Sequence, residues 1–348
     1  MASGKLDLLD LSYADLEQLL AGWGQPRFRA MQVWRWLYNA LSARPEEMAN
    51  LPKALRQRLA EETYVGGLVA IASNVAEDGS AEKVLLQMAD GQATEAVLMH
   101  YTERNTVCVS SQIGCAVGCT FCATGQQGFA RNLTAGEIIA QILLFARRLR
   151  AHGGHVTHVV FMGMGEPMLN FDAVWRAIRA LNHPEGLALG WRRFTISTAG
   201  VIPGIERLAH EGQEVGLAVS LHAADDVTRN SLLPIGRRYP LGKLIPAVKL
   251  YVERLGRRVT FEYVLLKGVN DGDEQARRTV ALLQGLLCHV NLIPLNPTPG
   301  CNHEPSLPER VSRFQEILLK GHIQATVRLR RGLDIQAGCG QLRGRYLG

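Results

Sequence analysis

The 348-residue sequence predicts an α/β protein in which a parallel sheet with crossover helices follows a small helical region. Two observations support this prediction. Runs rich in β-forming residues alternate with helical stretches from Thr106 onward, whereas residues 1–90 contain helical spacing and little strand-like alternation before Lys83–Met88. Alternating strands and helices are typical of parallel sheets. A partial or complete α/β barrel and an open doubly wound sheet share this local pattern, so both stay open here.

Residues 1–90 are predicted to form a helical accessory domain. Apolar residues recur at helical spacing in three segments separated by Pro and Gly, namely Tyr13–Leu20, Ala30–Leu41 and Leu55–Glu62. Residues 25–36 also interleave arginines with aromatic residues, a mixture that can contact phosphates and stack on bases. An amphipathic helix with solvated arginines and a buried tryptophan would show the same pattern.

Residues 91–330 are predicted to hold the alternating sheet. The expected strands are Thr106–Ile113, Val156–Met162, Phe194–Ser197, Val215–Leu221, Val259–Leu266 and His289–Ile293, before a short run at Ala325–Leu329. The expected helices are Thr134–Ala151, Phe171–Leu181, Leu241–Leu255, Glu274–Leu286 and Pro308–Lys320. In such folds, functional groups gather at the carboxyl ends of the strands.

Composition narrows the class of protein. Hydrophobic residues make up 47% of the chain, yet no window approaches the roughly 18 uninterrupted apolar residues that a membrane span needs. The first residues mix acids with leucines and lack the cleavage site of a secretory signal, so we expect a soluble, cytoplasmic protein. The net charge of +6 suits a polyanionic partner such as nucleic acid.

Three of the seven cysteines lie close together on a glycine-bearing loop. Cys115, Cys119 and Cys122 follow the first strand of the alternating region, where three thiolates can hold one metal centre. A structural zinc site usually has four protein ligands, and no fourth Cys or His lies nearby in the sequence. Three cysteines would leave one iron of a 4Fe-4S cluster open to a small molecule.

Longer motifs surround this loop, and a further motif lies near the end of the chain. They occupy residues 108–115, 126–129, 131–133, 163–167 and 334–342. Together with the C-x3-C-x2-C loop, they resemble the radical S-adenosylmethionine (SAM) enzymes, and among these the RlmN/Cfr family of RNA adenosine methyltransferases. The resemblance covers nearly the whole chain. It implies a partial parallel (β/α)6 barrel behind an N-terminal RNA-binding domain, with residues 331–348 as a C-terminal tail.

The resemblance also implies roles for individual residues. The three loop cysteines would hold a 4Fe-4S cluster, and Cys339 would first accept a methyl group and then form a transient crosslink to adenine. Glu95 would accept the ring proton. Cys108 would attack Cys339, forming a transient disulfide that releases the methylated base. Two SAM molecules would be consumed in each turnover. The implied SAM contacts are Gly165, Glu166, Ser197, Ser220, Leu221, His222 and Asn296.

The implied activity is methylation of carbon-2 of an adenosine in 23S rRNA and of the adenosine beside the anticodon in tRNA. Methylation at carbon-8, the antibiotic-resistance branch, is the alternative within the family. A non-enzymatic RNA-binding module with a structural metal knuckle is the alternative from another class. The resemblance further implies a low-potential electron donor such as flavodoxin or ferredoxin, and we expect a monomer without membrane attachment.

Overall fold

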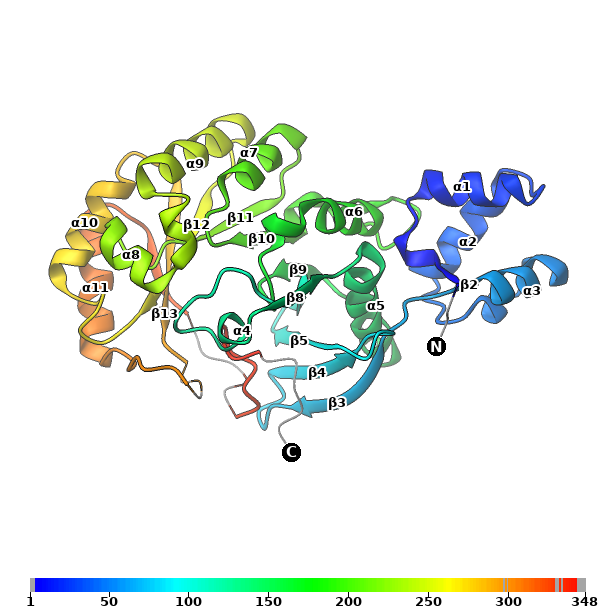
Figure 1. The fold of residues 1–348 in the computed structure, drawn as a ribbon, viewed down its shortest axis with the longest axis horizontal. Coiled ribbons are helices and arrows are strands. Elements are labelled where there is room, and N and C mark those ends of the chain that lie inside the picture. Colours follow the sequence, from blue (N-terminus) through cyan, green and yellow to red (C-terminus); the bar gives the residue numbers. More distant parts are fainter. Residues whose placement is uncertain (1–3, 297, 299, 329–331, 333, 343–348) are drawn as a thin grey trace.

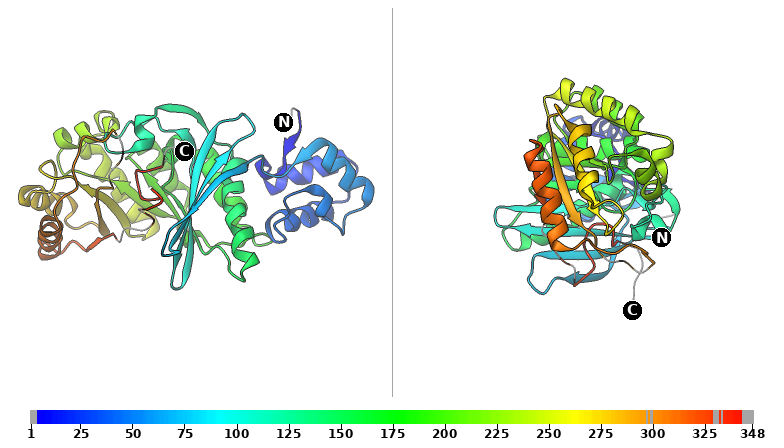
Figure 2. Two further views of the ribbon diagram at one scale, coloured as in Figure 1. Left: turned by 90° about the horizontal axis from the view of Figure 1, so that it is seen from below. Right: turned by 90° about the vertical axis from the view of Figure 1, so that its left-hand side faces the viewer.

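The computed structural model describes residues 4–296, 298, 300–328, 332 and 334–342. A helical lobe lies at one end of the molecule, and a large mixed sheet with its helices makes up the rest (Figure 1). Figure 2 shows that the molecule is elongated, with the lobe and helices α10 and α11 at opposite ends. Within the described residues, no helix is long and apolar enough to cross a membrane.

The lobe is built from short helices that bury their apolar faces. Its elements are β1 (Leu6–Asp7), η1 (Leu8–Asp10), α1 (Tyr13–Gly22), α2 (Phe28–Tyr38), η2 (Pro45–Glu47), α3 (Lys53–Glu62) and β2 (Thr63–Tyr64). Ser12 and Asp15 form a capping box that starts α1. In α2, Val33 and Trp34 are buried while Phe28 is 56% exposed, so the helix is amphipathic.

The lobe is fastened to the first long helix of the sheet region, α5 (Ala135–Ala151). Asp10 Oδ1 accepts a hydrogen bond of 2.6 Å from the Gly136 N–H near the start of that helix. Farther along α5, Arg147 Nε donates to the Leu41 carbonyl at 2.7 Å, and Nη2 donates to the Ser42 carbonyl at 3.1 Å. Arg147 therefore joins two parts of the fold.

The sheet has ten strands in the order β14-β13-β12-β11-β10-β9-β6-β5-β4-β3. The strands are β3 (Val69–Val75), β4 (Ala81–Gln87), β5 (Ala93–Tyr101), β6 (Arg104–Cys108), β9 (His158–Phe161), β10 (Phe194–Thr198), β11 (Gly216–Ser220), β12 (Val259–Leu265), β13 (Cys288–Pro294) and β14 (Ala325–Val327). Neighbours are antiparallel from β3 to β6 and parallel from β6 to β14. A separate pair is formed by β7 (Gln112–Gly114) and β8 (Phe129–Asn132).

The parallel strands follow one another in chain order without the reversal that defines a doubly wound sheet. In the sheet order the edges are β3 and β14, so the curved sheet does not close on itself. This arrangement confirms the partial parallel barrel. The remaining helices are α4 (Ala123–Gln126), α6 (Phe171–Asn182), α7 (Ile202–Glu211), α8 (Asp226–Leu232), α9 (Leu241–Leu255), α10 (Asp273–Leu283) and α11 (Pro308–Lys320), with 3-10 turns η3 (Pro167–Asn170), η4 (Trp191–Arg193) and η5 (Pro234–Arg237).

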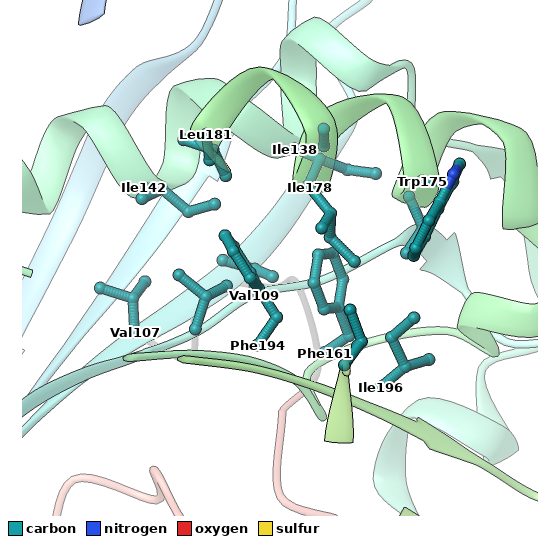
Figure 3. Packing of buried hydrophobic residues seen from close by; sticks show 14 of the residues in the cluster. Val107, Val109, Ile138, Ile142, Phe161, Trp175, Ile178, Leu181, Phe194 and Ile196 are labelled. Atoms are coloured by element: carbon teal, nitrogen blue, oxygen red, sulfur yellow. The ribbon is translucent and has the colours of Figure 1, made fainter. Parts of the chain in front are cut away.

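The main core lies between the sheet and the helices that pack on it. In Figure 3, Ile138 and Ile142 of α5 and Ile178 of α6 point toward the sheet, where they meet residues such as Phe161 and Phe194. All five side chains are at most 1% exposed. Burial of a side chain of this size stabilises the fold by about 1.5–3 kcal/mol.

The structure differs from the expected layout in one stretch. Residues 69–87, expected within the helical region apart from the strand-like alternation at Lys83–Met88, form β3 and β4 and extend the main sheet through antiparallel pairing with β5. The helical elements of the lobe end at Glu62. Val69, Ile71 and Val75 alternate with smaller residues in β3, but both faces of the strand are largely exposed. The strand lies at the edge of the sheet, where its pairing with β4 and not the burial of one face fixes its position.

Candidate active site

The three loop cysteines line one pocket at the carboxyl ends of the parallel strands. The pocket encloses about 930 Å³ of empty space, counted with its open mouth, and also receives Glu166, His222 and Cys339. The loop runs from β7 to α4. Its backbone is tight, because a Cβ at Gly125 would lie 2.8 Å from the Cys119 nitrogen. Glycine is therefore required where α4 folds back on the loop.

The loop cysteines are half-buried, and their thiols are largely desolvated. Burial raises the pKa of Cys115 to about 12 and the pKa of Cys119 well above its ordinary value. The neighbouring sulfurs and Glu166 act in the same direction on Cys119. Thiolates in such a pocket need a cationic centre to offset the lost hydration, which a metal cluster provides.

Among the described residues, no three His, Cys, Asp or Glu side chains could hold a single metal ion. The three loop cysteines are half-buried and line one pocket. Three cysteine ligands on one pocket are a donor set that fits a 4Fe-4S cluster with one iron left open to a small molecule.

Glu166 lies beyond the end of β9 and is 3% exposed. Its Oε1 accepts a hydrogen bond of 3.0 Å from the Met168 N–H, and its Oε2 accepts one of 2.7 Å from the Ala199 N–H. The carboxylate thus ties the ends of β9 and β10 together. Burial raises the pKa of Glu166 to about 7, although both backbone hydrogen bonds oppose this shift. A bound cationic group would favour the ionised form.

Gly165 allows the chain to pass close to the loop strand. Its φ is +101°, and a Cβ there would lie 2.5 Å from the Gln112 Cβ. Any side chain at this position would therefore strain the backbone and displace Gln112. The Glu166 N–H donates to Gln112 Oε1 at 2.9 Å, so Gln112 fixes the same turn from the other side.

Three further predicted SAM contacts also face the pocket, namely Ser197, Ser220 and His222. They follow or end β10 and β11. The Val264 N–H donates to His222 Nδ1 at 3.0 Å, which leaves Nε2 to carry the ring proton. Leu221 differs, because its side chain is fully buried in the main core and does not line the pocket. Only its backbone is near the site, where its N–H donates to the Glu262 carbonyl at 3.0 Å.

Asn296 connects the barrel to the segment that carries Cys339. Its Nδ2 donates to the Cys339 carbonyl at 3.2 Å. Its Oδ1 is buried and has no hydrogen-bond partner among the described residues. An unpaired buried acceptor is costly, so this atom is suited to a donor on a bound molecule.

The segment 334–342 is held beside the cysteine loop by backbone and side-chain hydrogen bonds. The Ala123 N–H donates to the Gly340 carbonyl at 2.7 Å, and Thr124 Oγ1 donates to the Leu342 carbonyl at 2.6 Å. On its other side the Glu77 N–H donates to Asp334 at 2.9 Å. The segment thereby closes one side of the pocket.

Cys108 and Cys339 line a second, adjoining pocket of about 850 Å³. Cys122, Asn296 and Arg328 line both pockets, so the two cavities meet at the Cys339 segment. Burial raises the pKa of Cys108 to about 12, and the Cys339 sulfur adds to this effect. Arg328 opposes it, because a nearby guanidinium favours the thiolate form of Cys108.

Glu95 reaches the same region through the register of the sheet. Lys83 of β4 pairs with Val97 of β5, and Val97 pairs with Cys108 of β6, so these three side chains share one face. Glu95 lies two residues from Val97 and therefore points to that face as well. Lys83 Nζ lies 3.2 Å from Glu95 Oε1.

The sequence did not indicate several residues of this site. Arg328 is one of many arginines in this basic chain and follows a short strand, yet it lines the pockets beside the two cysteines. Glu262 and Lys83 were not singled out, because each is one charged residue in an otherwise ordinary strand. Alternation alone could have shown that these residues face the barrel interior, but not which groups they meet there.

Two family models match this chain. The model of the radical SAM superfamily matches residues 109–280. The model of the ribosomal RNA large subunit methyltransferase N-terminal domain matches residues 6–65. The second match covers the helical lobe described above and ends before β3.

Similar proteins match over nearly the full length. A probable dual-specificity RNA methyltransferase RlmN from Chloroflexus aurantiacus is 47% identical over 350 residues, covering 97% of this chain and 93% of that protein. The dual-specificity RNA methyltransferase RlmN 1 of Myxococcus xanthus is 47% identical over 337 residues, covering 97% and 94%. The crystal structure of a radical SAM methyltransferase from Sphaerobacter thermophilus superposes with a TM-score of 0.96 at 52% identity, covering 98% of this chain and 100% of that chain.

Proposed function

Because the chain belongs to the RlmN family of radical SAM RNA methyltransferases, we propose that it methylates carbon-2 of adenosine in two RNAs. The proposed targets are an adenosine of 23S rRNA in the peptidyl transferase centre and the adenosine beside the anticodon of tRNA. Relatives described as dual-specificity RNA methyltransferases support the assignment of two RNA classes.

The chain is an enzyme whose cofactors are a 4Fe-4S cluster and SAM. We assign the cluster to Cys115, Cys119 and Cys122, which line the pocket together. Gly165, Glu166, Ser197, Ser220, His222 and Asn296 line the same pocket or adjoin it and would bind SAM, with the Leu221 backbone between two of them. When bound, the cluster and SAM supply the one-electron chemistry that activates an otherwise inert methyl C–H bond.

The observation that carries the proposal is the position of Cys339 between two pockets. It faces the cysteine loop on one side and Cys108 on the other. A sulfur that first accepts a methyl group and later forms a disulfide needs access to both. In this assignment Cys339 carries the methyl carbon to the adenine ring, and its carbon–sulfur bond breaks when Cys108 attacks the sulfur.

The carboxylate of Glu95 is assigned the remaining step, removal of the proton from the adenine carbon. It lies on the sheet face that Cys108 shares, and its side chain is only 5% exposed. A carboxylate that a lysine holds in place beside the reacting group can act as a general base. Its distance from the reacting carbon would be set by the bound RNA.

The proposed binding partners are RNA and an electron donor. RNA binding is assigned in part to the lobe, where Phe28 is exposed beside Arg27 and Arg29. A low-potential electron donor such as flavodoxin or ferredoxin would reduce the cluster. We propose that the enzyme acts as a cytoplasmic monomer.

Analysis of the methylated nucleosides tests the proposal. Protein with an intact cluster is incubated with SAM, a reductant and either a 23S rRNA fragment or tRNA, and the RNA is digested to nucleosides. We expect 2-methyladenosine from both RNAs. 8-Methyladenosine would instead assign the chain to the carbon-8 activity, and 2-methyladenosine from rRNA alone would contradict the dual specificity.

A further inference from the structure

Lys83 lies at a junction between the proposed proton acceptor and the segment that carries the methyl-accepting cysteine. Its Nζ is 3.2 Å from Glu95 Oε1. The same nitrogen donates to the Gln336 carbonyl at 3.3 Å. Gln336 precedes Cys339 by three residues, so a single ammonium group touches both parts of the site.

The environment of this junction is mostly dry. The side chain of Lys83 is 12% exposed and that of Glu95 is 5% exposed. An ion pair on an open surface contributes little, but burial of a lysine beside a carboxylate makes each group depend strongly on the other. Loss of the Lys83 ammonium would remove a cationic partner that lies 3.2 Å from the Glu95 carboxylate.

The fold places Lys83 here through two independent contacts. On one side, the register puts Lys83, Val97 and Cys108 in a row across β4, β5 and β6. On the other side, Ile335, Ala337 and Leu342 pack on the apolar cluster that contains Val97 and Cys108. The segment 334–342 therefore lies over the face on which Lys83 and Glu95 meet.

We propose that Lys83 is a positioning residue that couples Glu95 to the Cys339 segment. Its ammonium holds the carboxylate in one orientation and, by binding the Gln336 carbonyl, fixes the distance between that carboxylate and the methyl carrier. The inference rests on the proposed function, since it concerns the step assigned to Glu95. Lys83 itself need not touch RNA or cofactor.

The other contacts of the segment allow the two halves of the reaction to be separated. Asn296, Ala123 and Thr124 hold residues 339–342 without Lys83. Loading of Cys339 with a methyl group should therefore survive the loss of Lys83. Proton removal from the adenine, which needs Glu95 in place, should not.

The test compares Lys83→Met, Lys83→Gln and Lys83→Arg with the wild-type protein, after matched iron and sulfide content has been confirmed. For Lys83→Met, we expect methylation of Cys339 in the absence of RNA to stay within about threefold, while kcat for RNA methylation falls by about 100-fold at an unchanged KM. Lys83→Gln keeps a donor for the Gln336 carbonyl but lacks the charge, and it should lose kcat similarly. Lys83→Arg should recover most of it.

A double-mutant cycle separates positioning from a general loss of structure. If Lys83 acts through Glu95, Lys83→Met combined with Glu95→Gln should be no slower than Glu95→Gln alone. Arg148→Met is the matched control, because Arg148 pairs with Glu82, the residue beside Lys83 on β4, and that pair lies on the opposite face of the sheet. This control should retain wild-type kcat.

The possible results have distinct meanings. Wild-type kcat in Lys83→Met, additive losses in the double variant, or no recovery in Lys83→Arg would each overturn the role of Lys83. A wild-type protein that methylates RNA without ever methylating Cys339 would overturn the proposed function instead.

Discussion

At the scale of single residues, burial decides the charge state of side chains around the pocket. Burial lowers the pKa of His222 to about 3, and the nearby Arg229 acts in the same direction. With Nδ1 accepting from the Val264 N–H, the neutral ring can only donate through Nε2. His222 is therefore suited to binding an acceptor on a cofactor and cannot serve as a cation at neutral pH.

Asp7 provides a test of the same principle away from the catalytic groups. Burial raises its pKa to about 6, although its Oδ1 accepts hydrogen bonds from the Leu9 and Gly66 N–H groups at 3.0 and 2.9 Å. Between about pH 4 and pH 6 the folded chain thus holds this proton more tightly than the unfolded chain. The free energy of unfolding contributed by Asp7 falls as the pH rises through that range and stays lower above it.

Asp7→Asn should remove this dependence. The asparagine Oδ1 can accept both backbone hydrogen bonds, so we expect the variant to be about 1–3 kcal/mol more stable than wild type at pH 7.5 and nearly equal at pH 4. Urea unfolding at several pH values measures the difference. Asp172→Asn is the control, because Asp172 is 86% exposed and should show little change. Equal stability of Asp7→Asn and wild type at pH 7.5 would contradict the account.

At the scale of elements, local signals fix the ends of some helices but not the strands at the edge of the sheet. The expected limits of α9 and α11 agree with the structure. Gly256 ends α9 in a left-handed conformation, and Pro308 starts α11, both of which are readable signals. Strand β3 has no buried face, and its place at the edge of the sheet depends on its pairing with β4.

The residues of the candidate active site could likewise be predicted only in part from the sequence. Positions at the ends of parallel strands were predictable, because chain order and strand ends together locate them. The contact between Lys83 and Gln336 joins residues 253 positions apart, and it depends on how the segment 334–342 packs on the sheet. No local pattern in one sequence contains that information.

The hydrogen bond from Thr124 to the Leu342 carbonyl is expected to hold the segment 334–342 against the cysteine loop. Thr124→Val keeps the shape of the side chain but removes the 2.6 Å hydrogen bond to the Leu342 carbonyl. We expect the segment to open more readily by about 1 kcal/mol, so that Cys339 is alkylated about fivefold faster by iodoacetamide. The measurement is made by mass spectrometry of the Cys339 peptide. Thr279→Val, which removes a hydrogen bond within the distant α10, should leave the rate unchanged. Equal rates in Thr124→Val and wild type would show that this bond does not hold the segment.

At the scale of the whole molecule, the lobe and the barrel carry different functional groups. The barrel and its last segment hold the reactive groups, while the lobe presents an exposed aromatic side chain and basic residues. The structure contains the helical region predicted from the sequence. Trp34, an aromatic residue of the segment that interleaves arginines with aromatic residues, is buried in the core. Phe28 of α2 is exposed and is therefore available for stacking on a base.

Phe28→Ala tests whether the lobe contacts RNA without taking part in the methylation of Cys339. Stacking on a base contributes about 1–3 kcal/mol, so we expect RNA affinity to fall by about tenfold or more, while methylation of Cys339 without RNA stays unchanged. Fluorescence anisotropy with labelled RNA at fixed salt measures the affinity. Leu319→Ala, at an exposed apolar position on α11, is the matched control. Wild-type affinity in Phe28→Ala would exclude this residue as an RNA contact.

The proposed methylation of RNA requires Cys339 to carry the methyl group. The most direct measurement is the mass of the Cys339 peptide from anaerobically purified protein incubated with SAM and reductant in the absence of RNA. We expect one added methyl group on Cys339 in the wild-type protein and none in Cys115→Ala, which lacks a cluster ligand. An unmodified Cys339 in protein with an intact cluster would contradict the account.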